Sequence, residues 1–594
     1  MQGQPGPGGL PGCTGRSAGT GYLRHVGALA LIVLGGLAFA TAAPALEPSA
    51  TALSHTPGLL ESDVIPSVLS QQDARLYRRV FALQDKGEWA AADGELARLS
   101  DRTLLGYVLA QRYLSPAYKA SYAELKTWLE RHGDQPGAEG IFGLAMSRKP
   151  RKEDPPRRLV PSPDIYTLPV YTFTRPDLVG AGGQRNLRQQ TGQRRSAVAA
   201  QDEMRLRRAA SAFFNGEDAA ALAIASPLSD RTREALPLAD WIAGLAAWRQ
   251  GKPKVAATHF HALAQSEVAS AWERAAGGVW AARAYLVDRQ PAMVNRMLAL
   301  AAEHDRTFYG LIAQRMLGRE PSLSWSWPPL DRGAAQQLAR LPTVRRAIAL
   351  AEADQHGRAD GEIRLLLAQV DPQWAPSVLV LALQLKVPVS QVQLAKGVER
   401  AHGRLFDAAF YPLPPWRPEG GFTLEPALLF AFMRQESGFK AGAESAAGAR
   451  GLMQLMPGTA SFVANDPTLR EHAKAKLFEP ELNLHLGQKY LEHLMGQYGV
   501  KGNLFFLAAA YNGGPGNLEK WQKAIDYKDD PLLFIESLPS GQTRVFVERV
   551  IANYWIYCHR MGVPTPSLDQ VAEGDWPRYL PGNNGIWNGR SARN

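Results

Sequence analysis

A single carboxylate at the end of an apolar helix is the side chain of this sequence best suited to acid chemistry. Glu436 closes the run LEPALLFAFMRQESGF, which begins with a Glu-Pro pair typical of a first helical turn. The negative end of the helix dipole opposes ionisation there, and Phe432 and Met433 would desolvate the carboxyl group, so both effects raise its pKa. Such an acid can protonate a poor leaving oxygen, for example that of a glycosidic bond. The alternative is an exposed helix-end glutamate capped by Ser437.

Two glycine-rich segments further along the chain could place polar groups beside a ligand. SAAGARGLMQLMP places Gly448 and Gly451 around a predicted short helix that carries Gln454, which indicates a wall where the backbone approaches a ligand and an amide hydrogen-bonds to it. The alternative is a tight helix crossing with methionine as filler. NLFFLAAAYNGGPG ends an apolar helix at Tyr511 and Asn512 and then turns sharply, so a phenol and an amide are predicted at a rigid corner. Alone, this segment could be an ordinary turn.

The remainder of the chain is predicted to be helical. Apolar residues recur three and four residues apart from about 70 to 145 and again from about 203 to 402. Small residues lie where helices would cross, and aromatic residues would fill the gaps between helices. Stacked helical hairpins in a solenoid-like array explain this pattern, because single hairpins cannot bury their own apolar faces. His259 and His261 are two apart and should face different sides of a helix, so we expect no metal pair there.

Proline, glycine and arginine mark the boundaries between these regions. The segment 147–200 reads as a basic, exposed excursion, or alternatively as an arm that binds an anionic polymer. FYPLPPWRPEGGF interrupts the helices with four prolines. We therefore predict a signal peptide at 1–43, an α-superhelical domain at 64–402, a linker at 403–422, a catalytic domain at 423–565 and a tail at 566–594.

Composition and the N-terminus limit the cellular context. The chain has 594 residues, of which 45% are hydrophobic, and a formal charge of +10, which favours a polyanionic partner. No zinc-finger spacing, Walker loop or aromatic-basic RNA motif is present, so we expect no nucleic acid partner. The basic start, apolar run and Ala-x-Ala ending of RHVGALALIVLGGLAFATAA predict a cleaved secretory signal, with a retained membrane anchor as the alternative. Cys558, the single cysteine left after cleavage, is predicted to be buried in a helix.

Together these segments resemble the catalytic domain of the family 1 soluble lytic transglycosylases, lysozyme-like enzymes that cleave bacterial peptidoglycan. The Glu-Ser pair, GARGLMQLMPGTA, PELNLHLGQKYL, AAYNGGPGN and RVFVERVIANYWIY occur in the family's order and approximate spacing over about 412–562. The preceding helices resemble the family's superhelical, ring-forming domain more loosely. The resemblance implies an all-α fold, with an α-superhelical, solenoid-like region followed by a lysozyme-like catalytic domain.

The resemblance also implies roles for individual residues. Glu436 would be the sole catalytic acid and base. The residues expected to bind substrate are Ser437, Ser445, Gly451, Met453, Gln454, Met456, Tyr511, Asn512 and Gln542. Where the family often has Glu-Thr-Arg, this chain has an amide at Gln542, which can still donate and accept hydrogen bonds but carries no charge.

The implied reaction is cleavage of the MurNAc-GlcNAc β-1,4 bond with formation of 1,6-anhydroMurNAc ends. No metal and no cofactor is expected. The expected protein is periplasmic and monomeric, with peptidoglycan glycan strands as its partner and peripheral association with the membrane or cell wall. A hydrolytic muramidase of the same fold and a non-catalytic wall-binding scaffold are the alternatives.

Overall fold

The computed structural model describes residues 66–157, 197–329, 332–367, 372–403 and 405–580. The predicted signal peptide and most of the predicted basic excursion lie outside the described residues. Within these ranges the structure is helical, with isolated bridges between single residue pairs and no β-strand. The predicted all-α class is therefore confirmed. No helix in the described ranges is long and apolar enough to cross a membrane.

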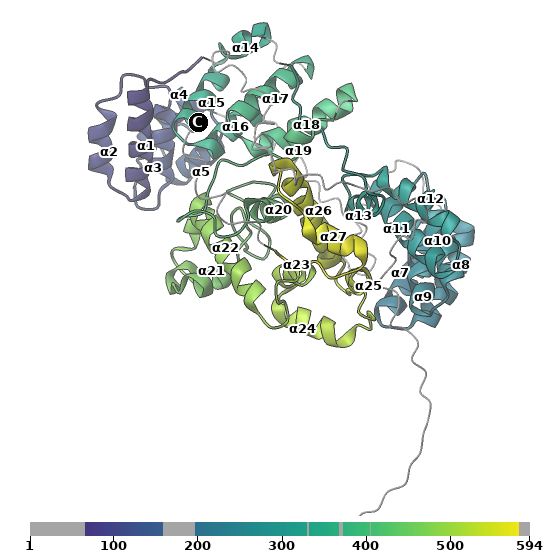
Figure 1. Ribbon diagram of the computed structural model, residues 1–594. Coiled ribbons are helices and arrows are strands. Elements are labelled where there is room, and N and C mark those ends of the chain that lie inside the picture. Colours follow the sequence, from purple (N-terminus) through teal and green to yellow (C-terminus); the bar gives the residue numbers. More distant parts are fainter. Residues whose placement is uncertain (1–65, 158–196, 330–331, 368–371, 404, 581–594) are drawn as a thin grey trace, which may run out of the picture. The chain divides into compact units, whose positions relative to one another are not determined.

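The described residues 66–157 form five helices, which Figure 1 labels. They are α1 (Gln71–Asp85), α2 (Trp89–Leu96), α3 (Leu105–Leu114), α4 (Tyr122–His132) and α5 (Ala138–Arg148). α1 packs against α2 and α3, while α4 packs against α3 and α5. Serines start two of them, because Ser70 caps α1 and Ser121 forms a reciprocal capping box with Glu124 in α4.

The next seven helices form the array that the sequence predicts. They are α7 (Ala197–Phe214), α8 (Asp218–Thr232), α9 (Leu238–Arg249), α10 (Pro253–Ala264), α11 (Ala271–Val287), α12 (Pro291–Ala302) and α13 (Phe308–Met316). Each helix packs against the next one along the chain. Small residues allow the close crossings: a Cβ at Gly277 would lie 2.8 Å from the Ala264 nitrogen, and one at Gly278 would lie 2.8 Å from the Met297 oxygen. The predicted stacking of helical hairpins is confirmed.

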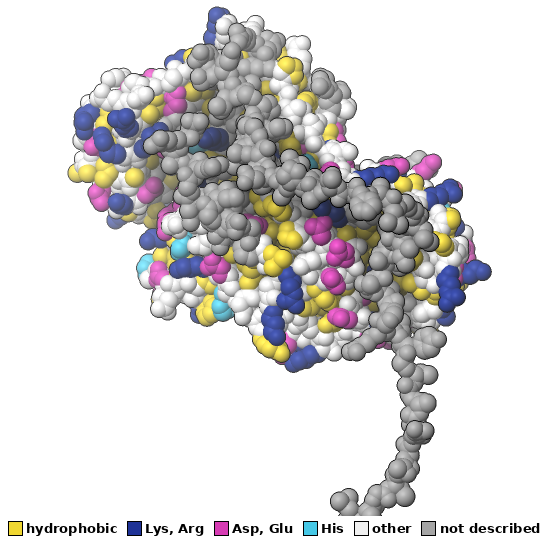
Figure 2. Space-filling view, in the orientation of Figure 1, with side chains coloured by type: hydrophobic (Ala, Val, Ile, Leu, Met, Phe, Trp, Pro, Cys, Tyr) yellow, Lys and Arg dark blue, Asp and Glu magenta, His cyan; other side chains and the backbone are white. Residues whose placement is uncertain are grey.

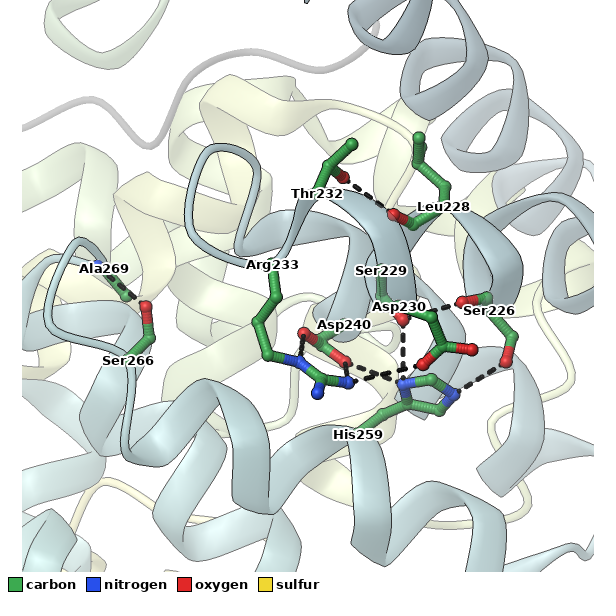
Figure 3. Close-up of polar contacts among 10 residues, drawn as sticks. All are labelled: Ser226, Leu228, Ser229, Asp230, Thr232, Arg233, Asp240, His259, Ser266 and Ala269. Atoms are coloured by element: carbon green, nitrogen blue, oxygen red, sulfur yellow. Dashed lines mark hydrogen bonds and ion pairs between the residues drawn. The ribbon is translucent and has the colours of Figure 1, made fainter.

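A buried polar cluster joins α8, α9 and α10, as Figure 3 shows. Asp240 is fully buried and pairs with Arg233 at 2.9 Å and with His259 Nδ1 at 2.7 Å. Burial alone would raise the pKa of Asp240, but the hydrogen bonds from His259 and Arg233 outweigh it and lower the pKa. His259 Nε2 also lies 3.1 Å from Ser226 Oγ, whereas His261 lies 2.7 Å from the Tyr285 hydroxyl of α11. The two histidines thus face different neighbours, as predicted.

Five further helices complete the region that the sequence assigns to the superhelical domain. They are α14 (Arg332–Leu338), α15 (Pro342–Glu352), α16 (His356–Leu367), α17 (Ala375–Gln384) and α18 (Pro388–His402), with a short 3₁₀ turn at Pro372–Trp374. α15 to α18 pack in sequence. Tyr107 of α3 donates a 2.5 Å hydrogen bond to Glu362 of α16, which also pairs with Arg346. This contact joins the first helices to these later ones.

The C-terminal part holds the helices that carry the candidate site. They are α19 (Asp407–Phe410), α20 (Pro426–Glu436), α21 (Pro457–Ala464), α22 (Pro480–Gly496), α23 (Leu504–Gly513), α24 (Pro515–Ala524), α25 (Pro531–Ser537), α26 (Gly541–Met561) and α27 (Pro566–Glu573), with 3₁₀ turns at Pro467–Arg470 and Lys474–Phe478. α20, whose first eight residues are all buried, packs along α26. Cys558 is buried in α26, as predicted.

Residues at both ends of the predicted catalytic domain are packed into the molecule. In the predicted linker, the buried carboxylate of Asp407 pairs with Arg306 at 2.5 Å. In the predicted tail, Ser567 accepts a 3.0 Å hydrogen bond from Trp555, and Tyr579 accepts one from the Glu425 backbone. Helix packing therefore continues on both sides of the predicted domain, and the domain boundaries stay predictions.

Candidate active site

Glu436 is the last residue of α20 and is half-buried. Phe432 and Met433, one turn earlier, are fully buried. Desolvation raises the pKa of Glu436 from 4.5 to about 8, and among the described residues no charged neighbour contributes to this shift. The direction predicted from the sequence is therefore confirmed, with desolvation as its cause. Glu436 is protonated at neutral pH and yet reaches the surface, which suits a general acid.

Tyr511 of α23 joins the acid to the glycine-rich segment. Its ring lies against Phe432, with centroids 4.8 Å apart, and its hydroxyl donates a 2.7 Å hydrogen bond to the Met453 carbonyl oxygen. Burial raises the pKa of Tyr511 well above its usual value, and Glu436 raises it further once that carboxyl group is ionised. The phenol is therefore neutral. Through Tyr511, α20, the glycine-rich segment and α23 meet at this site.

The glycine-rich segment is a compact hairpin-like loop and not the short helix that the sequence indicates. Glu444 and Arg450 form one antiparallel bridge, and Arg450 and Leu455 form another. Ser445 Oγ accepts a 3.0 Å hydrogen bond from the Ala449 backbone. Gln454 has a positive φ of 46°, and its side-chain nitrogen donates to the carbonyl oxygens of Ala443 and Gly451. Since that nitrogen is engaged, a ligand contact from Gln454 would use its side-chain oxygen.

Asn483 of α22 holds this loop in place, and sequence reasoning did not single it out. Its Oδ1 accepts a 2.8 Å hydrogen bond from the Met453 nitrogen, and its Nδ2 donates to the carbonyl oxygens of Arg450 and Leu477. The side chain is fully buried. Gly451 lies directly over it, because an added Cβ would come within 2.4 Å of Asn483 Nδ2. The signal in the sequence was an asparagine placed between two leucines in the helical segment PELNLHLGQKYL.

Several predicted substrate-binding residues have different surroundings. Met456 is 43% exposed at the start of α21 and can contact a ligand. Met453 is fully buried against Gly487, so its side chain cannot reach a ligand in this conformation, and the corresponding prediction does not fit the structure. The reason is that hydrogen bonds to Asn483 and Tyr511 fix its backbone so that the side chain turns into the core.

Gly451 is also buried, and its lack of a side chain permits the close packing over Asn483. Ser437 is buried, and its hydroxyl donates a hydrogen bond to the Met433 carbonyl oxygen one turn earlier in the chain.

The corner after α23 is tied to the start of α26. Asn512 is half-buried and accepts a 2.9 Å hydrogen bond from the buried Thr543 hydroxyl. Thr543 is also bonded to Ser540, the residue that caps α26. Gln542 lies beside Thr543 and is exposed. Asn512 thus supports the corner with its carbonyl oxygen, while the Gln542 amide points to solvent.

Among the described residues, no group of three or more His, Cys, Asp or Glu side chains is placed so that it could hold a metal ion. The residues that meet at this site can supply acid and base catalysis through Glu436, with the Tyr511 phenol as a neutral neighbour.

Comparison with known proteins places this site in a recognised domain. Residues 417–533 match the family of transglycosylase SLT domains. The soluble lytic murein transglycosylase of Salmonella typhimurium is 29% identical over 291 residues, which cover 46% of this chain and 42% of that protein. The protein of the same name from Escherichia coli K12 is 34% identical over 163 residues, covering 27% of this chain and 24% of that protein. The matched part of the chain thus spans less than half the length of these relatives.

Two solved structures are similar over much of the chain. The 70 kDa soluble lytic transglycosylase from Escherichia coli is 18% identical, with a TM-score of 0.49, and the match covers 86% of this chain and 99% of that one. An inactive mutant of the lytic transglycosylase Slt from Pseudomonas aeruginosa is 21% identical, with a TM-score of 0.49, over 86% of this chain and 89% of that one.

Proposed function

Given that residues 417–533 form a transglycosylase SLT domain of the kind found in soluble lytic murein transglycosylases, we propose that this chain is a peptidoglycan lytic transglycosylase. The observation that carries the proposal is the half-buried Glu436, whose pKa of about 8 keeps it protonated before the reaction. The substrate is the glycan strand of peptidoglycan, cleaved between N-acetylmuramic acid and N-acetylglucosamine.

In the first step, Glu436 donates its proton to the glycosidic oxygen as the bond from C1 of the muramic acid to that oxygen breaks. The substrate's own N-acetyl group stabilises the positive charge that develops at C1. Most glycosidases use two carboxylates, and substrate assistance explains how one suffices. Desolvation keeps Glu436 protonated until this step, and it also makes the carboxylate that the step produces a stronger base for the next one.

In the second step, the carboxylate of Glu436 takes the proton from the C6 hydroxyl of the same muramic acid. The C6 oxygen then bonds to C1 and closes a 1,6-anhydro ring. Glu436 ends protonated, as it began, and no water is consumed. Water in place of the C6 hydroxyl would instead give a muramidase, so product mass distinguishes the two reactions.

Replacement of Glu436 by Gln tests the assignment. The amide keeps the shape of the side chain but has no transferable proton, so both steps fail together. Activity on purified sacculi should fall by at least about 10⁴-fold, the upper end for a general acid-base group. Glu519→Gln is a matched control, because Glu519 is an exposed carboxylate paired with Lys523 on α24. Substantial cleavage by folded Glu436→Gln would assign the chemistry to another acid.

The native products test the reaction type. Mass spectrometry of digested sacculi should show muramic ends lighter by one water than hydrolytic ends. Hydrated ends alone would identify a muramidase, and intact sacculi bound by the protein without any cleavage would identify a scaffold.

The proposed location is the periplasm, with export directed by residues 1–43. A fusion of residues 1–50 to a reporter that is active only outside the cytoplasm should be active, and the mature chain should begin near Ala43. A full-length protein recovered from the cytoplasm would refute this location.

A further inference from the structure

Arg434 shares the last turn of α20 with Glu436. Figure 2 shows Lys and Arg side chains at the surface in several parts of the molecule, where water solvates them, whereas Arg434 is half-buried. Residues two apart in a helix point to nearly opposite sides, so the guanidinium of Arg434 faces away from the Glu436 carboxyl group. In agreement, the pKa of Glu436 is raised by desolvation and not by this charge. Any effect of Arg434 on the acid must therefore act through the helix.

Three contacts hold the Arg434 guanidinium between neighbouring elements. Its Nη1 donates a hydrogen bond to the carbonyl oxygen of Phe410, the last residue of α19. Its Nε donates a 3.3 Å hydrogen bond to Asn553 Oδ1 of α26. Its central carbon lies 4.3 Å from the centroid of the buried Tyr411 ring, which is a cation–π contact. These contacts, called the Arg434 clamp below, tie the last turn of α20 to α19 and α26.

The groups that Arg434 contacts are themselves held in place. The Tyr411 ring packs edge-on against the Tyr557 ring of α26, with centroids 5.7 Å apart. At the start of α19, the buried carboxylate of Asp407 pairs with Arg306, which precedes α13. α20 packs along α26 as well. The Arg434 clamp thus fixes the turn against residues that lie before and after the matched SLT domain.

The turn that carries Glu436 depends on such support. The last carbonyl groups of a helix lack partners within it, and helix ends fray unless other elements hold them. The chain leaves α20 through Gly438 and Phe439, both with a positive φ, of 55° and 69°. The reversal that follows Glu436 therefore cannot extend the helix to stabilise this turn. A small outward movement of the turn would give the carboxyl group more contact with water.

We propose that Arg434 is a positioning residue for the acid, because the Arg434 clamp holds the last turn of α20 so that the Glu436 carboxyl group stays shielded and meets the glycosidic oxygen. The proposal rests on the proposed function. Without the clamp, the carboxyl group gains water contact and its pKa falls toward the ordinary 4.5. Since a general acid must be protonated to act, activity is then lost at a lower pH. Misplacement of a reacting group by about 1 Å can also lower the rate by about 10²-fold.

Kinetics of Arg434→Met and Arg434→Lys in the full chain test this role. Methionine removes the guanidinium, whereas lysine keeps the charge but offers a point donor in place of the planar fork. On soluble glycan strands, kcat of Arg434→Met should fall by about 10- to 100-fold with KM changed by less than about 2-fold, because Arg434 does not touch the substrate. The alkaline limb of the kcat profile should move down by about one pH unit or more. Arg434→Lys should lie between Arg434→Met and the native enzyme in both respects.

The matched control is Arg98→Met. Arg98 is an exposed arginine just beyond α2, and it pairs with Glu95, outside the Arg434 clamp. This variant should change neither kcat nor the pH profile. A fall in kcat equal to that of Arg434→Met would show that the loss is not specific to the clamp and would overturn the proposal.

A second measurement follows the Glu436 proton without catalysis. Because the folded-state pKa of Glu436 is raised, Glu436→Gln should increase the denaturant midpoint more at high pH than at low pH. When Arg434→Met is also present, this pH-dependent gain should shrink by about half or more, since the carboxyl group is already closer to its unfolded-state pKa. A purely structural role of Arg434 would lower the midpoint equally at every pH and leave the gain as it was.

An unchanged pH-dependent gain in Arg434→Met would overturn the proposal, whatever happens to kcat. A raised KM with unchanged kcat would also overturn it, because Arg434 would then act on substrate binding. If Arg434→Met does not fold, Arg434→Lys decides by the same measurement: a smaller gain supports the clamp and an unchanged gain refutes it. If the native chain cleaves no glycan, the proposed function fails, while a reduced gain would still establish the clamp.

Discussion

The raised pKa of Glu436 predicts that the acid lowers the stability of the protein that carries it. In the folded chain this carboxyl has a pKa of about 8, whereas the ordinary value is 4.5. The folded state therefore binds the proton more tightly than the unfolded chain does. Between pH 4.5 and about 8 the free energy of unfolding should fall as pH rises. In this range the unfolded chain releases the Glu436 proton to water, whereas the folded state must keep the proton bound or bury the charged carboxylate.

Glu436→Gln removes this penalty and should stabilise the protein at neutral pH. Each unit of pKa shift corresponds to about 1.4 kcal/mol, so at pH 7 the gain has an upper limit of about 3 kcal/mol. The half-buried side chain retains some solvent contact, which reduces the gain below this limit. Below pH 4.5 both states carry the proton, and the difference between the variant and the native protein should disappear.

Denaturant unfolding at about pH 4, 6 and 8 measures this difference. The lowest pH lies below the ordinary pKa of 4.5, and the highest lies near the folded-state pKa of about 8. The unfolding midpoint of Glu436→Gln should coincide with that of the native protein at the lowest pH and exceed it increasingly as pH rises. Glu519→Gln is the control, since hydrogen bonding by Lys523 lowers the pKa of the exposed Glu519 and gives no such gain. A difference independent of pH, or a variant less stable at the highest pH, would refute the reasoning.

Three further substitutions test the supports of the site. Asn483→Ala leaves the backbone groups that it bonds in Met453, Arg450 and Leu477 without a partner and should lower the free energy of unfolding by about 3 kcal/mol. Denaturant titration measures this loss, and a loss near zero would show that other contacts hold the loop. Gly451→Ala places a Cβ within 2.2 Å of the Leu477 oxygen at a φ of 77°, so activity on sacculi should fall sharply in a folded protein; full activity would refute this fit. Phe308→Ala should lower the free energy of unfolding by about 3 to 5 kcal/mol, since this fully buried ring of α13 stacks on Trp555 of α26. If the α7–α13 array then unfolds separately and leaves α26 unaffected, the two regions do not share a core.

Local sequence pattern was sufficient for the acid and for the helices outside the glycine-rich segment. The apolar run ending at Glu436 specifies a helix whose last residue is flanked by buried side chains, so the direction of its pKa shift follows from neighbours one turn away. The all-α class and the stacked hairpins follow in the same way from period and from small residues at crossings such as Gly277 and Gly278. These features depend on contacts within or between consecutive helices.

Features that depend on distant contacts were decided by the tertiary structure. Met453 appears in the sequence beside Gln454 and Met456 as another residue of a ligand wall, but bonds from Asn483 and Tyr511 to its backbone turn its side chain into the core. Nothing near position 453 indicates those partners, because they lie 30 and 58 residues away along the chain.

The extent of the core was likewise decided by long-range packing. The prolines of FYPLPPWRPEGGF predict a boundary, yet one hydrophobic core includes Phe308 of the array and Trp555 of the C-terminal part. Local breakers such as proline end helices through their own backbone, so the sequence identifies where an element stops. Which apolar faces then meet depends on the free energy of burying them together, and for Phe308 and Trp555 that partnership joins residues on two sides of the predicted boundary.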